Sequence, residues 1–366
     1  MEGRGRGGGE AWSLAAYLGT NVTSVCWLPR CDHRTRTAYL LTGTSDESIN
    51  KVGLWSFSLP DWEDEEEETG PQPPSPLADN VVFGSVAGLK VVERDSSLFA
   101  LSVTTHGNLN VHKVFFDTSS SLSKEDRLKR TSTWERLHRS ACTAFDVRAE
   151  SNEIVTAGED GALHFVQLEQ AITKPHLSIE NADSSGVSSV HFISSHSVLS
   201  VGSTGHLKLF DLRTNSNAQQ DFTMVKTMKD AGSSILQCAA VHPHQPSFVV
   251  TGAHDGSIAF WDLRHPKWPF QSYAQHTADV WDIQFHAAHP DNVISASEDG
   301  TLLLWNFNPK NEMRGTFTAD KEQLLLRKLL RQRVGLNSLA VLPEMNMLCC
   351  AADNEALLFL GELLPE

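Results

Sequence analysis

Two nine-residue stretches of the 366-residue chain are similar, GHLKLFDLR at 205–213 and GSIAFWDLR at 256–264. Around each first glycine the pattern is an apolar run, a small polar residue, a tight polar turn and a second apolar run. It recurs around Gly107, Gly161, Gly300 and Asn354, and a longer-turned variant occupies 40–55. The spacing ranges from 44 residues (161 to 205) to 54 residues (107 to 161). Seven units at this period indicate a repeat architecture.

Each unit has the pattern of several β-strands. The stretch VVTGAHDGSIAFWD at 249–262 is typical of a β-hairpin with an Asp-Gly turn. A strand with alternating apolar residues precedes most hairpins, as in VWDIQFH at 280–286, and a less regular strand follows, as in FQSYAQ at 270–275. Four antiparallel strands in each of seven units predict an all-β fold, a seven-bladed β-propeller.

The last unit supplies only three strands before the chain reaches its final residues, GELLPE. The apolar stretch AWSLAAYLG at 11–19 is the natural fourth strand. We therefore expect residues 11–366 to form a single propeller that is closed by an N-terminal strand.

These residues resemble the WD-repeat family over nearly the whole chain, with Trp261-Asp262 as the eponymous dipeptide and Phe210-Asp211 and Trp305-Asn306 as near matches. The resemblance implies a structural tetrad in which an indole, a hydroxyl, an imidazole and a carboxylate form one buried network. One complete set is present: His276, Ser295, Asp299 and Trp305. Other units are incomplete: Thr251, Asp255 and Trp261 lack an evident loop histidine, Thr204 replaces the aspartate near Ser200 and Phe210, and Val166 replaces the tryptophan near Thr156 and Asp160.

Three segments do not fit the repeat. Residues 1–10 form a Gly/Arg tail that we expect to be disordered, and 59–80 form an acidic, proline-rich loop insertion. Its acidic part, 61–68, is interpreted as solvated, with a docking site for a basic partner as the alternative. The leucines of DKEQLLLRKLLRQR at 320–333 would share one helical face, which predicts a helical insertion within 307–333. That helix would pack on its own propeller or contact a membrane or another chain.

Composition argues against several function classes. The net charge of −15 disfavours a general nucleic-acid binder, and no apolar stretch approaches the ~20 residues of a membrane helix. The N-terminus lacks the apolar region of a secretory signal, so we expect a cytosolic or nuclear protein. The six cysteines do not have zinc-site spacing, and neither a catalytic motif nor a phosphate loop is evident despite 16 histidines. We therefore expect no enzyme activity, metal, cofactor or small-molecule substrate.

A narrower resemblance covers 179–213, with NADSS at 181–185, and 242–264. These stretches are similar to the small WD-repeat nucleoporins of the Y-shaped outer-ring complex of the nuclear pore. The resemblance implies a non-enzymatic scaffold subunit at the nuclear envelope that binds a helical-solenoid nucleoporin and supports pore assembly and the transport of mRNA and protein. It also implies a role at kinetochores in mitosis and a propeller that is monomeric outside the complex, without membrane insertion.

Two pairs of residues are candidate partner contacts. Asp279 and Trp281 lie where a loop enters a first strand, so we expect them near one rim, although the tryptophan could instead pack between blades. Arg213 and Arg264 fit a WDxR box. That box resembles substrate receptors of cullin–RING ubiquitin ligases, which is the alternative function. In the structural interpretation, each arginine pairs with the acid of its own blade.

Overall fold

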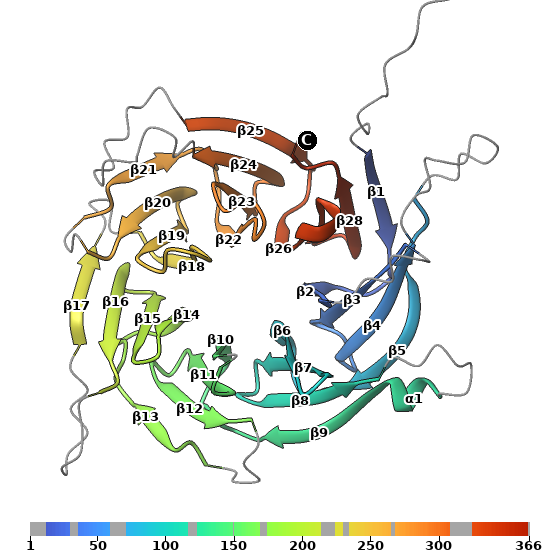
Figure 1. Ribbon diagram of the computed structural model, residues 1–366, viewed down its shortest axis with the longest axis horizontal. Coiled ribbons are helices and arrows are strands. Elements are labelled where there is room, and N and C mark those ends of the chain that lie inside the picture. The colour runs from blue at the N-terminus through green and yellow to red at the C-terminus, as the bar shows by residue number, and fades with distance from the viewer. Residues whose placement is uncertain are drawn as a thin grey trace, which may run out of the picture.

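The computed structural model describes residues 12–29, 36–58, 71–115, 123–148, 150–168, 174–213, 224–229, 234–264, 268–307 and 324–364. These residues form seven four-stranded antiparallel sheets that surround a central axis like the blades of a propeller (Figure 1). The predicted seven-bladed propeller is confirmed. The predicted tail at 1–10 and the acidic stretch at 61–68 lie outside the described residues.

The strands follow one another from the axis outward in blades 1 to 6. Blade 1 contains β2 (Val22–Trp27), β3 (Thr37–Thr44), β4 (Lys51–Ser58) and β5 (Ser75–Val81); blade 2 contains β6 (Val86–Arg94), β7 (Ser97–Thr104), β8 (Leu109–Val114) and β9 (Leu128–Trp134); blade 3 contains β10 (Cys142–Arg148), β11 (Glu153–Gly158), β12 (Leu163–Gln167) and β13 (Leu177–Ile179). Blade 4 contains β14 (Val187–Ser194), β15 (Ser197–Gly202), β16 (His206–Asp211) and β17 (Met224–Lys229); blade 5 contains β18 (Leu236–Val241), β19 (Phe248–Ala253), β20 (Ser257–Asp262) and β21 (Gln271–Ala274); blade 6 contains β22 (Val280–Phe285), β23 (Asn292–Ser297), β24 (Thr301–Phe307) and β25 (Leu324–Arg331).

Blade 7 is built from both ends of the chain. Its inner strands are β26 (Leu336–Leu342), β27 (Met347–Ala352) and β28 (Ala356–Gly361), and its outermost strand is β1 (Trp12–Tyr17). Strand β1 pairs with β28 from Trp12 opposite Gly361 to Tyr17 opposite Ala356, so the two ends of the colour ramp lie side by side in Figure 1. The predicted closure by an N-terminal strand is confirmed.

Aromatic packing covers the seam between blades 7 and 1. The rings of Phe57 and Phe359 stack with centroids 4.4 Å apart, and Trp27 lies against both of them. The indole N–H of Trp27, in blade 1, donates to the carbonyl of Ala340, in blade 7, over 2.9 Å. All four residues are buried, so the junction is held by apolar burial as well as by the strand pairing of blade 7.

The repeated glycine meets two constraints at once. The glycine has a positive φ, +74° at Gly161 and +82° at Gly256, and this conformation closes the hairpin between the second and third strands. A Cβ atom at Gly161 would also meet the carbonyl oxygen of Asp183, and one at Gly256 would meet that of His276, each in the loop that enters the next blade. In blade 7 the positive-φ position is Glu355 rather than the expected Asn354.

The expected helix at 320–333 is wrong, because 324–331 form the strand β25. As a strand, this segment hydrogen-bonds along β24, from Phe307 opposite Leu324 to Thr301 opposite Arg331, and Leu329 and Leu330 pack on the core between blades 6 and 7. The four helical residues of α1 (Lys124–Arg127) and the 3₁₀ turn η2 (Pro343–Met345) are the helical elements in the described residues. Within that part of the chain, no helix could cross a membrane.

The loop expected at 59–80 is also wrong in its last part. Residues 75–81 form β5, which pairs with β4. Pro76 lies opposite Trp55 at a register shift. Because β5 is the outermost strand, a proline there does not interrupt a ladder on its far side.

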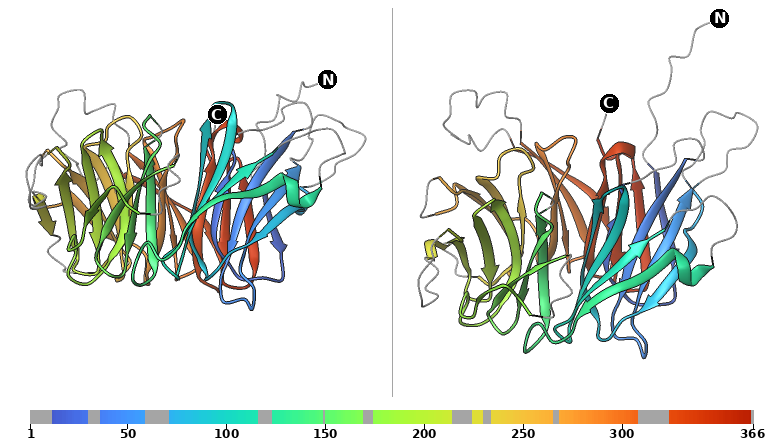
Figure 2. Two further views of the ribbon diagram at one scale, coloured as in Figure 1. Left: turned by 90° about the horizontal axis from the view of Figure 1, so that it is seen from below. Right: turned by 60° about the horizontal axis from the view of Figure 1, so that its bottom comes forward.

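The innermost strands surround a channel of about 470 Å³ along the propeller axis. Figure 2 shows the blades from the side, with the strands of each blade running between the two faces of the disc. Polar side chains of these strands and their entry loops bridge each blade to the next one. The contacts, from the junction of blades 1 and 2 around to that of blades 7 and 1, are Thr23 to Val86 O (2.6 Å), Lys90 to Asp146 (2.6 Å), Asp146 to Phe192 N (2.8 Å), His191 to Ala239 O (2.8 Å), Gln237 to Asp279 (3.1 Å), Asp282 to Leu339 N (2.9 Å) and Ser338 to Val25 N (3.3 Å).

Asp282 occupies the junction between blades 6 and 7. One carboxylate oxygen accepts hydrogen bonds from the backbone N–H of Leu339 and from the hydroxyl of Ser338. Burial nevertheless raises the pKa of Asp282 from 3.8 to about 6. A carboxyl with a higher pKa in the folded state binds protons on folding, so the free energy of unfolding falls as the pH rises from about 4 to about 6.

Removal of residues 1–20 deletes β1 and leaves the edge of β28 unpaired. We expect this truncation to lower the melting temperature of the whole propeller in one cooperative transition, as followed by circular dichroism. A truncation of residues 1–8 retains β1 and is the matched control. If both truncated proteins melt like the full chain, the N-terminal strand does not stabilise the ring.

The variant Asp282→Asn keeps an oxygen for Leu339 N–H and Ser338 but cannot ionise. We expect it to increase the free energy of unfolding at pH 8 by about 1–2 kcal/mol, and by progressively less below pH 6. Denaturant titrations at several pH values measure both quantities. A variant that is destabilised equally at pH 4.5 and pH 8 would contradict the raised pKa, because its effect would then not depend on the ionisation of Asp282.

Candidate functional site

The four predicted tetrad residues come together in blade 6. The indole Nε1–H of Trp305 donates to Ser295 Oγ over 2.9 Å, and Ser295 Oγ lies 2.7 Å from His276 Nε2. His276 Nδ1 faces Asp299 at 3.2 Å. Trp305, Ser295 and the imidazole are buried, so this chain of hydrogen bonds connects the entry loop, the second strand, the turn and the third strand.

Thr301 is a fifth member that the sequence pattern missed. Its hydroxyl lies 2.9 Å from His276 Nδ1 and donates to Asp299 over 2.6 Å. Burial opposes the ionisation of Asp299, but hydrogen bonds from Thr301 and from the backbone N–H of Thr277 outweigh it and hold its pKa below 3.8. Burial lowers the pKa of His276, so a neutral imidazole beside an ionised carboxylate is the stable arrangement at neutral pH.

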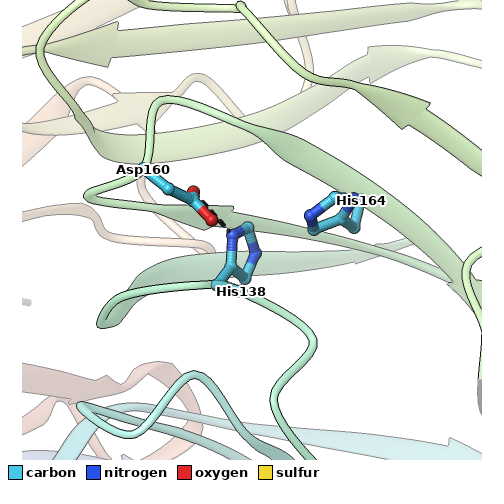
Figure 3. Close-up of side chains that lie close together, drawn as sticks. All are labelled: His138, Asp160 and His164. Atoms are coloured by element: carbon cyan, nitrogen blue, oxygen red, sulfur yellow. Dashed lines mark hydrogen bonds and ion pairs between the residues drawn. The ribbon is translucent and has the colours of Figure 1, made fainter.

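A second network of this kind lies in blade 3, around a histidine that sequence reasoning overlooked. His138 Nε2 lies 2.9 Å from Thr156 Oγ1, and His138 Nδ1 lies 3.0 Å from Asp160 (Figure 3). His138 precedes the first strand by four residues (138 to 142), as His276 does (276 to 280). This spacing was the signal available in the sequence.

The blade 3 network has the composition of a metal site, since ligand atoms of His138, Asp160 and His164 lie within 4.8 Å of one another. However, both ring nitrogens of His138 face protein partners, and Nδ1 of His164 lies 2.8 Å from Ser178 Oγ. Burial and the neighbouring His138 lower the pKa of His164. His276 and Asp299 adopt the same pairing in blade 6 around a tryptophan, so hydrogen bonding accounts for the cluster.

In blade 4 the carboxylate of the network comes from the entry loop instead of the turn. Asp183, within the NADSS run, occupies the loop position that histidine takes in blades 3 and 6, four residues before the first strand. It accepts from Thr204 over 2.8 Å and pairs with Lys208 Nζ at 2.7 Å. Both charged side chains are largely buried, so each depends on the other for compensation. Thr204 occupies the turn position where the other networks have an aspartate. Its hydroxyl donates to the carboxylate of Asp183 in the loop.

The candidate rim residues lie at one mouth of the channel. We call this side the turn face; it carries the hairpin turns at Gly107, Gly161, Gly205, Gly256 and Gly300 and the loops that enter the innermost strands. Trp281 lines the channel, is 41% exposed, and donates from Nε1 to Glu298 Oε2 over 2.8 Å. Asp279 accepts from Gln237 and pairs with His254 Nδ1 at 2.6 Å. Asp279 is thus engaged within the propeller, whereas the indole of Trp281 is accessible.

Arg213 and Arg264 follow the third strands of blades 4 and 5 on the opposite face. Nη2 of Arg213 donates to Asp211 over 2.6 Å, and Nη2 of Arg264 donates to Asp262 over 2.7 Å. The backbone N–H of each arginine donates to the same aspartate. Each guanidinium is therefore bound by the aspartate of its own blade. This is the pairing expected if the two arginines stabilise their own hairpins.

The network of blade 6 predicts strong coupling between its members. We expect Asp299→Ala to lower the free energy of unfolding by roughly 1–3 kcal/mol, because buried His276 and Thr301 lose their acceptor. A double-mutant cycle of Asp299→Ala with His276→Ala, followed by denaturant titration, measures the interaction between the two side chains. Strictly additive losses would contradict a connected network.

Comparison with known proteins connects this propeller to established families. Residues 136–364 match the family model described as Nucleolar protein 10-like, N-terminal domain. The chain is also 26% identical to Nucleoporin Nup43 of Homo sapiens over 80% of this chain and 75% of that protein. It is 33% identical to Nucleoporin Nup43 of Mus musculus over 45% of this chain and 41% of that protein. For the nuclear pore complex protein nup43 of Dictyostelium discoideum, identity is 24% over 60% of this chain and 54% of that protein.

These similarities agree with the predicted resemblance to a WD-repeat nucleoporin. The family model covers well over half of the sequence, including blades 3 to 6 and the three inner strands of blade 7. The chain therefore belongs to the family of nucleolar protein 10-like N-terminal β-propeller domains.

Proposed function

We propose that this chain is a non-enzymatic scaffold subunit of the nuclear pore complex that assembles with other nucleoporins at the nuclear envelope. The observation that carries the proposal is the similarity, over 80% of the chain, to a relative named as a nucleoporin. The buried polar networks support a scaffold role, because they connect strands and turns of the propeller rather than open onto a substrate pocket.

At a finer level, we infer membership of the Y-shaped outer-ring complex and binding to a helical-solenoid nucleoporin. This inference is supported by the resemblance of residues 179–213 and 242–264 to the small WD-repeat nucleoporins of that complex. In this role the protein supports pore assembly and the transport of mRNA and protein, and it acts at kinetochores in mitosis. We further infer that the propeller is monomeric before assembly and contacts proteins rather than nucleic acid or membrane.

We infer that the turn face around Trp281 makes the partner contact. An exposed tryptophan supplies a large apolar surface, and its bond to Glu298 already restricts the indole to one orientation. Binding therefore loses little side-chain entropy there. The rim formed by innermost strands is also rigid, because every junction between blades carries a polar contact.

The test is affinity capture of the tagged full-length chain from nuclear-envelope extract, with quantitative mass spectrometry. We expect outer-ring nucleoporins to dominate the wild-type capture and Trp281→Ala to reduce them by about tenfold, the loss of roughly 1–2 kcal/mol typical of an aromatic interface residue. Circular dichroism of the purified variant verifies its fold. A capture without nucleoporins would contradict the proposed function.

The double charge reversal Arg213→Glu/Arg264→Glu is the matched control on the opposite face. We expect it to leave nucleoporin capture unchanged, since each arginine contacts the aspartate of its own hairpin. Trp281→Ala that folds and captures nucleoporins normally would assign the contact to another surface. A cullin adaptor that is present in the wild-type capture and lost only from the arginine variant would favour the ligase alternative.

A further inference from the structure

Strand β25, the segment LLLRKLLR at 324–331, is the outer edge of blade 6 (Figure 1). It pairs with β24 on its inner side and ends the sheet. An outermost strand of an antiparallel sheet presents alternate backbone N–H and C=O groups outward, which can pair with a further strand. At eight residues, β25 is longer than the described outer strand of any other blade.

Exposed apolar side chains of β25 favour the binding of another chain at this edge. Leu325 and Leu326 are 69% and 39% exposed, and they point to opposite sides of the strand. Residues 325–328 are exposed without interruption. On the outer strands of the other blades whose side-chain burial is described, the longest run of exposed residues is 129–131 in β9, and the exposed large apolar residues are Tyr17 on β1 and Val81 on β5.

The edge is also strongly basic. Lys328 and Arg331 lie on β25, Arg333 follows it, and all three side chains are exposed. Arg327 donates to the carbonyl of Leu363 in blade 7. Among the described residues, Lys328, Arg331 and Arg333 have no acidic group within ion-pair distance, in contrast to Lys51, which pairs with Asp79 across blade 1.

We propose that β25 is a docking edge for an extended acidic segment of a partner protein, which adds a fifth strand to blade 6. Its backbone would pair with the outward N–H and C=O groups of β25. Its carboxylates would lie on one side of the added strand, beside Lys328, Arg331 and Arg333, and its alternate apolar residues would cover Leu325 on the other side. This inference concerns a surface separate from Trp281 and does not depend on the nuclear pore assignment.

Charge determines which occupant this edge selects. A second copy presenting the same edge would bring two sets of cations together, and like charges placed opposite one another destabilise a strand pair. The same basic residues that repel a copy attract carboxylates, so the edge discriminates by sign. We therefore assign it to an acidic partner rather than to self-association.

The probe is a synthetic peptide of alternating glutamate and valine residues, EVEVEVE-amide, with fluorescein attached to its N-terminal amine. We expect it to bind the full-length chain, to weaken with added salt, and to slow amide hydrogen exchange in β25. The variant Lys328→Glu/Arg331→Glu should weaken binding by about tenfold or more. Lys129→Glu, an exposed reversal on the outer strand of blade 2, is the matched control and should bind like wild type.

A peptide with N-methyl groups on all of its backbone amides has the same charge but no N–H donor on either edge of the strand. We expect it not to bind; equal binding would overturn strand addition, as would peptide binding without slower exchange in β25. Absence of binding by the unmodified peptide to the wild-type chain would also overturn the proposal. A dimer in analytical ultracentrifugation that is lost in the double reversal would assign the edge to a second copy instead.

Discussion

The pairing of β1 with β28 is the constraint on which the rest of the structure depends. Six blades are continuous in sequence, but the seventh takes its outermost strand from residues 12–17 and its other strands from 336–361. This pairing joins the chain ends across a six-residue ladder and turns an open array of blades into a ring. Each blade can then bury both faces against neighbours, including the aromatic seam of Trp27, Phe57 and Phe359.

Closure also gives the inner polar contacts their function. A ring of side chains crosses all seven blade junctions, and it would be incomplete if blades 7 and 1 moved apart. Farther out, the networks of blades 3, 4 and 6 tie an entry loop to strands of the same blade. The turn glycine completes the connection, because it allows the loop of the next blade to approach the hairpin backbone. The turn face therefore holds Trp281 on a rigid frame.

The repeat pattern was sufficient to predict the propeller, because alternation, turn chemistry and a period near 50 residues each indicate the same blade. The tetrad of blade 6 could be found because its four residue types are retained. His138 was missed because Val166 interrupts the pattern, and Asp183 with Lys208 was missed because the carboxylate lies in the entry loop instead of the turn and a lysine faces it. A search for one expected residue type at each position does not find either network. The networks are recognised only when it is known which side chains are in contact.

The segment 324–331 shows where local pattern fails. Its leucines have helical spacing, but the free edge of β24 offers a complete set of backbone partners, and tertiary pairing overrides local preference. The difference between the predicted helix and the observed strand matters for function. A helix would have placed the leucines on one face. The strand instead distributes Leu325 and Leu326 to its two sides along an unpaired edge.

The N-terminal strand makes the seven blades one cooperative unit. Native-state hydrogen exchange with residue resolution tests it directly, by comparing the opening free energies of amides in β1 and β28 with those in blades 2 to 6. We expect the hydrogen-bonded amides of β1 to open only with the global unfolding of the propeller. Exchange of β1 amides at low free energy, while β28 and the other blades stay protected, would contradict it.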